Sequence, residues 1–84
     1  MELSSIDDSK PKLVGVLVKC INNLCREINR PKSKQKLRDS LNAMQLFESI
    51  LYRINHSSII VSKEEYIAQL ASIYHIMNDV FGSH

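Results

Sequence analysis

The stretch that decides the fold runs from Ser33 to His56 and reads SKQKLRDSLNAMQLFESILYRINH. At about 100° per residue, its apolar side chains fall into two neighbouring strips on a helix. The first strip contains Leu37, Leu41, Met44 and Leu51, with Phe47 at its edge, and the second contains Ala43, Leu46, Ile50 and Ile54. Because a surface helix needs only one such strip, the pattern predicts a helix with apolar neighbours on two sides.

Two further helices are predicted, one before and one after this stretch. The first has Pro11 in its opening turn and ends before Pro31. The middle of its apolar side contains Leu13, Val14, Leu17, Ile21, Leu24 and Ile28. The last begins where Ser62 and Glu65 have the spacing of a capping box, and it ends at Gly82. The sequence therefore predicts an all-α, antiparallel up-down-up three-helix bundle, with helices at approximately 10–30, 33–56 and 62–81.

The segments outside these helices are short. Ser33 is predicted to cap the second helix. Ile59, Ile60 and Val61 are β-branched, but three residues without a partner strand cannot build a sheet, so we expect an extended apolar linker lying on the core. Residues 1–8 are predicted to form a short polar arm of a single domain that spans residues 1–84.

Composition limits the possible locations and partners. A formal net charge of +2 over 84 residues is too small to require a polyanionic partner. The N-terminus has no signal-peptide pattern and no run is long enough to cross a bilayer, so a cytoplasmic location is expected. Cys20 and Cys25 are five residues apart in a predicted helix and cannot pair within it. Both are predicted to be small buried hydrophobic residues in a reducing compartment.

No pattern in the sequence is typical of a catalytic or metal site. The chain lacks a glycine-rich phosphate loop, paired cysteines at zinc spacing, and a histidine with another histidine or a cysteine one helical turn away. We therefore expect neither enzymatic activity nor a cofactor.

A basic turn joins the first two predicted helices and contains Arg30, Lys32, Lys34, Lys36 and Arg38. Lys34, Lys36 and Arg38 fall in the opening turns of a helix, where the helix dipole favours carboxylates. An anion on a nucleic acid, a lipid headgroup or an acidic protein would compensate this charge, whereas the alternative is a solvated turn that keeps the chain soluble. No aromatic residue is interleaved with the cations, which argues against sequence-specific recognition of nucleic acid.

The apolar circumference of the three helices exceeds what a three-helix bundle hides. The excess predicts a protein partner or a homo-oligomer, with a dimer as the expected form, and the favoured contact strip is Ala43, Leu46, Ile50 and Ile54. The alternative is that flank residues are partly exposed without any partner, namely Val16, Val18, Ala68 and Ala71. The leading hypothesis is a small non-enzymatic helical interaction module. Its rival is a nucleic-acid or membrane-surface binder that uses the basic turn.

In size and helical pattern the chain resembles two bacterial groups, with local similarity around Leu51 to Tyr66. One group is the bacteriocin immunity proteins, which are small cytosolic helical bundles, and the other is the small type III secretion chaperones, which are helical hairpins that hold a partner subunit. The chain departs from both, since the former usually have four helices and the latter usually lack a third helix as long as residues 62–81. The resemblance implies an adaptor, chaperone or immunity-type role and assigns no functional residue.

Overall fold

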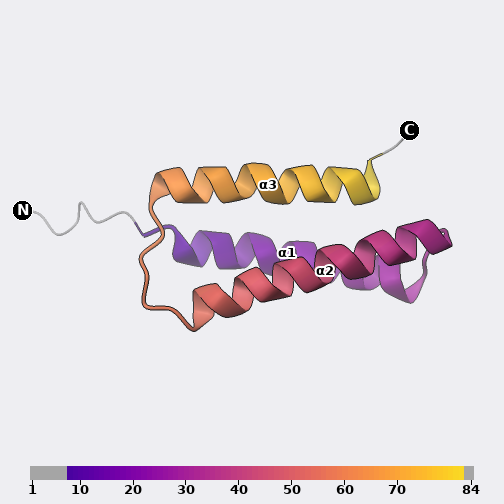
Figure 1. The fold of residues 1–84 in the computed structure, drawn as a ribbon, viewed down its shortest axis with the longest axis horizontal. Coiled ribbons are helices and arrows are strands. Elements are labelled where there is room, and N and C mark those ends of the chain that lie inside the picture. Colours follow the sequence, from indigo (N-terminus) through magenta and orange to yellow (C-terminus); the bar gives the residue numbers. More distant parts are fainter. Residues whose placement is uncertain (1–7, 83–84) are drawn as a thin grey trace, which may run out of the picture.

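Three helices make up the part of the chain that the computed structural model describes, residues 8–82. They are α1 (Lys10–Asn29), α2 (Lys34–Asn55) and α3 (Lys63–Phe81), and no strand occurs within this range. In Figure 1, α1 and α3 run in the same direction and α2 runs back across α1, which confirms the predicted up-down-up bundle. Residues 1–7 of the predicted polar arm lie outside the described range. None of the three helices combines the length and the apolar character of a membrane span.

Local hydrogen bonds set the helix boundaries, and two of them follow the predicted caps. The Ser33 hydroxyl accepts from the Lys36 N–H at 3.0 Å, and the Ser62 hydroxyl accepts from the Glu65 N–H at 3.1 Å. Each bond satisfies one of the free amides of a first turn. At the end of α3, a Cβ added to Gly82 would collide with the Asn78 carbonyl oxygen, so this close approach requires glycine.

The core side of α1 is rotated relative to the prediction. Its buried row contains Leu13, Leu17, Cys20 and Leu24, and it continues to Glu27. Val14, Ile21 and Ile28, which were predicted at the middle of the apolar side, are only half-buried, and Val18 on the far flank is exposed. The reason is that α2 and α3 both pack against this one helix, and the buried row is the part of its surface that lies between them.

Helix α2 packs against both α1 and α3, as its two apolar strips predicted. Its buried residues are Ser40, Ala43 and Phe47, and they lie along the line between the strips. Leu41 and Leu46 lie at the two outer edges of the strips and stay nearly half exposed. The centre of the double strip is therefore core, while both edges remain at the surface.

The linker between α2 and α3 is tied to the start of α1. The Ser9 N–H donates to the Val61 carbonyl at 2.8 Å, and the Val61 N–H donates to Asp8 Oδ1 at 3.2 Å. These bonds hold the Val61 side chain in the core. Ile59 and Ile60, however, are 68% and 53% exposed, so the expectation that the whole apolar linker lies on the core was wrong. In an extended segment Ile60 faces away from Val61, and Ile59, two residues before Val61, lines an open surface groove and not the core.

Ser40 offers a direct test of the packing between α1 and α2. Its hydroxyl is fully buried and has no hydrogen-bond partner, a state that costs about 1–3 kcal/mol. We expect Ser40→Ala to raise the free energy of unfolding by about 1 kcal/mol or more, because it removes the orphan hydroxyl with almost no change in volume. Urea unfolding followed by circular dichroism measures this change.

The matched control is Ser49→Ala, which is on the exposed side of the same helix. It changes only helix propensity, a gain of about 0.5 kcal/mol. Equal gains for the two variants, or a loss for Ser40→Ala, would contradict the burial of an unpaired hydroxyl.

Candidate partner-binding groove

The structure divides the predicted contact strip between three environments. Ala43 is 4% exposed and belongs to the core, so it offers no surface to a partner. Leu46 is 46% exposed and lies beside α3 in a shallow depression that Ile76 and Val80 also line. Ile50 and Ile54 are half-buried and line a separate groove one to two turns further along α2. The strip is therefore continuous along α2 but does not form one site.

The groove lies where α2 and α3 diverge, at the end of the bundle that contains the linker. Its volume is about 260 Å³, and it is open to solvent on one side. Its apolar lining comes from α1, α2 and the linker, and consists of Leu13, Ile50, Ile54, Ile59 and Val61. Because α2 and α3 are joined by a long connection here, they separate and leave the side of α2 that carries Ile50 and Ile54 uncovered.

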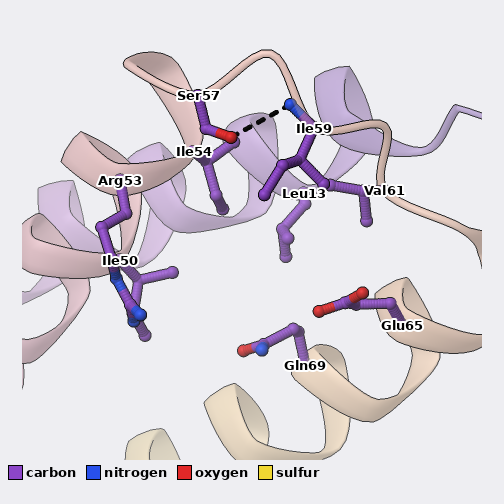
Figure 2. A pocket seen from close by; sticks show the side chains of 9 residues that line it. All are labelled: Leu13, Ile50, Arg53, Ile54, Ser57, Ile59, Val61, Glu65 and Gln69. Atoms are coloured by element: carbon purple, nitrogen blue, oxygen red, sulfur yellow. Dashed lines mark hydrogen bonds between the residues drawn. The ribbon is translucent and has the colours of Figure 1, made fainter.

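Polar groups line the same groove from opposite walls. Figure 2 shows Arg53 on α2 and Glu65 and Gln69 on α3 at its sides. Among the described residues, Arg53 and Glu65 do not form an ion pair within 4 Å, so both charges are available to a ligand. Ser57 also lines the groove, and its hydroxyl accepts from the Ile59 N–H at 3.0 Å, which orders the linker.

Sequence reasoning missed the linker and α3 contributions to this groove. Ile59 was predicted to belong to a linker lying on the core, and Glu65 was noted only for its capping spacing. Nothing local in the sequence marks Gln69 or Leu13 as neighbours of Ile54. Their proximity depends on the hydrogen bonds between the linker and α1, which join residues that are 53 positions apart in the case of Asp8 and Val61.

The basic turn is exposed, and its backbone is held by a buried acid. Arg30, Lys32, Lys34 and Arg38 have exposed side chains, and the first turn of α2 contains no carboxylate. Glu27 is 8% exposed, and its Oε2 accepts from the Lys32 N–H at 2.9 Å. The exception is Lys36, which is half-buried with its Nζ 5.8 Å from the centroid of the Phe81 ring. The turn is thus ordered, and four of its five cations face solvent.

The two cysteines differ in environment. Cys20 is buried in the core and burial raises the pKa of its thiol, whereas Cys25 is exposed. The prediction that both are buried was therefore wrong for Cys25, because the buried side of α1 is rotated away from it. Within residues 8–82, no group of three or more His, Cys, Asp or Glu side chains is placed to hold a metal ion.

Comparison of the chain with protein-family models, with curated proteins and with solved structures gives no match.

The cysteine environments predict selective alkylation. We expect iodoacetamide to modify Cys25 in the folded protein and to modify Cys20 only on the unfolding timescale, because burial both shields the thiol and lowers its thiolate fraction at neutral pH. Peptide mass spectrometry after a short pulse distinguishes the two sites. Equal labelling of both thiols in native buffer would show that the Cys20 side of α1 is not enclosed.

Proposed function

We propose that the protein is a non-enzymatic helical interaction module that binds an apolar segment of a partner protein in the groove between α2 and α3. The observation that carries this proposal is an open groove with an aliphatic lining and charged side chains on both walls. Contacts of this kind combine an apolar centre, which supplies affinity, with a polar rim, which supplies orientation.

The size of the groove favours a protein segment over a small metabolite. Its volume of about 260 Å³ is below the ~300–1,000 Å³ typical of pockets that enclose a drug-sized ligand. It suits one or two large aliphatic or aromatic side chains, which are the usual anchors of a protein–protein contact. Leu46 extends the apolar surface along α2, so a longer partner segment would find a second contact there.

The polar walls favour one orientation of the bound segment. Arg53 donates from the α2 side, while Glu65 accepts from the α3 side. A peptide lying between them presents carbonyl oxygens and amide protons that match these two groups. The same arrangement disfavours a purely lipidic ligand, which has no donor for the Glu65 carboxylate.

The rival function, anion binding by the basic turn, is supported by one specific observation. Four of the five cations in the turn are exposed at the start of a helix whose first turn contains no acid. A helix N-terminus with added cations attracts phosphate or carboxylate groups. This interaction would be electrostatic and therefore strongly salt-dependent.

The groove proposal predicts binding of a neutral apolar probe. We expect Nile red to fluoresce with the native protein and to shift the NMR methyl signals of Ile50, Ile54 and Val61. Ile54→Glu should weaken dye binding by about tenfold or more, because it places a charge in the apolar lining. The matched control is Tyr52→Glu, which adds the same charge at an exposed position on the opposite side of α2.

Equal effects of these two variants, or methyl shifts confined to other surfaces, would contradict the proposal. Light scattering at two protein concentrations adds a second readout. A mass that doubles with concentration and is restored to the monomer by Ile54→Glu would identify the partner segment as part of a second copy of this chain.

Salt separates the groove from the basic turn. We expect Nile red binding to change little between about 0.05 and 0.5 M salt, because apolar contacts are not screened. A labelled single-stranded oligonucleotide serves as the polyanion in a parallel titration. Tight oligonucleotide binding at low salt that is lost at high salt, and that is abolished by Lys34→Glu with Arg38→Glu, would favour the rival function.

A further inference from the structure

Helix α3 carries a second apolar row beside its core side, and three of its five residues are exposed. It consists of Ile67, Leu70, Tyr74, Met77 and Phe81, which we call the outer stripe. Ile67, Tyr74 and Phe81 recur every seven residues and are 55%, 59% and 36% exposed. Leu70 and Met77 lie between them and are half-buried. Alternating steps of three and four residues are the spacing of a coiled-coil seam.

The exposed members of the outer stripe are distinct from the core side of α3, whereas Met77 also packs against the core. The core side contains Ile73 and Val80, which are buried, with Tyr66 packed against the core. Each exposed member of the stripe follows one of these residues by one position, so it is rotated by about 100° around the helix axis. Packing among the described residues therefore leaves Ile67 and Tyr74 largely uncovered, while Lys36 covers part of Phe81.

A row of cations on α1 lies beside the outer stripe. Lys12, Lys19 and Arg26 are exposed and also recur every seven residues, and we call them the cation row. Arg26 and Phe81 line the same surface depression, which fixes the register between the two helices. Because α1 and α3 run side by side in the same direction (Figure 1), Lys19 is placed near the level of Tyr74 and Lys12 near the level of Ile67.

The basic turn extends this positive border around the end of the stripe. Lys32 lines the depression beside Phe81, and Lys36 lies over the Phe81 ring. Within residues 8–82, none of these cations has a carboxylate of the same range within 4 Å, since the one ion pair found there joins His75 and Asp79. The border therefore presents several cations next to an apolar seam, and the one acid that lines the depression with them, Glu27, is buried and accepts from the Lys32 N–H.

We propose that the outer stripe docks an amphipathic α-helix of a partner protein, with apolar residues at alternating three- and four-residue spacing and acidic residues on the side that faces α1. The apolar seam supplies the packing and the cation row supplies the register and the direction. This surface is separate from the groove between α2 and α3, so neither proposal depends on the other.

The charge pattern selects this occupant over a second copy of the chain. A second copy offers no acidic row of matching length, because the free flank of its own stripe contains Glu64, Ala71 and Asn78. An anionic membrane is also a poorer match. Interfacial helices carry cations on both borders of the apolar face, whereas the border of the stripe that faces away from α1 contains the acidic Glu64 and no cation.

The test uses designed peptide probes. One helical peptide of about three heptads has Leu at the seam positions and Glu along the flanks, and its matched partner has Lys in place of every Glu. We expect fluorescence anisotropy to show binding of the Glu peptide and at least about tenfold weaker binding of the Lys peptide. Tyr74→Glu should weaken binding of the Glu peptide by at least about tenfold, because aromatic residues dominate such contacts.

Charge reversal on α1 tests the register independently of the seam. Lys19→Glu should weaken binding of the Glu peptide and strengthen binding of the Lys peptide, a reversal that general destabilisation cannot produce. Val18→Glu, one position away on a different side of α1, is the matched control and should change neither affinity. Ile54→Glu should also leave peptide binding unchanged, which separates this surface from the groove. Circular dichroism confirms that the variants are folded.

Four outcomes would overturn the proposal. Equal binding of the two peptides would remove the role of charge, and an unchanged affinity for Tyr74→Glu would remove the role of the stripe. Tighter binding to vesicles of phosphatidylserine and phosphatidylcholine than to the Glu peptide would show that a membrane covers the face. A dimer by light scattering that Tyr74→Glu dissolves would show that a second copy covers it.

Discussion

The buried row on α1 is the surface on which the rest of the structure depends. Leu13, Leu17, Cys20 and Leu24 form a single line of side chains, and α2 and α3 both pack against it. Burial of these residues supplies much of the hydrophobic stabilisation available to so small a chain. One line of side chains cannot cover two neighbouring helices completely. The exposed apolar surface of this protein follows from that limit and not from any local irregularity.

The connection between α2 and α3 determines where the uncovered surface lies. Asp8 and Ser9 hold Val61 against the start of α1, so α3 begins beside α1. The end of α2 lies apart from the start of α3. The α2–α3 groove opens at this end. At the other end the basic turn is short, and Glu27 orders it by accepting from the Lys32 N–H, so the helices stay close together. The two ends of the bundle thus differ in their connections. The α2–α3 linker is hydrogen-bonded to the residues that begin α1, whereas the α1–α2 turn is hydrogen-bonded to Glu27 in the helix just before it.

The sequence predicted those parts of the fold that depend on short-range signals. The caps at Ser33 and Ser62 need only the few residues that follow them, and both were identified correctly. The sequence did not predict which side of α1 faces the core. Its apolar residues cover so wide an arc of the helix circumference that the arc has no unique centre. The groove was missed for a different reason, since Ile54 and Glu65 become its opposite walls only after the linker is tied to α1. No pattern within α2 or α3 alone indicates how far Ile54 lies from Glu65.

Helix α3 combines a small buried side with an exposed apolar row. Helix α3 has only Ile73 and Val80 fully buried, whereas its outer stripe leaves Ile67 and Tyr74 more than half exposed. A helix held by so few core residues gains little stability from propensity alone. Any ligand that covers the stripe or fills the groove binds the folded chain and not the unfolded one, so it stabilises α3 by mass action. Large apolar side chains at heptad spacing are costly to leave in water on a marginally stable helix, and that cost is recovered when a partner packs against them.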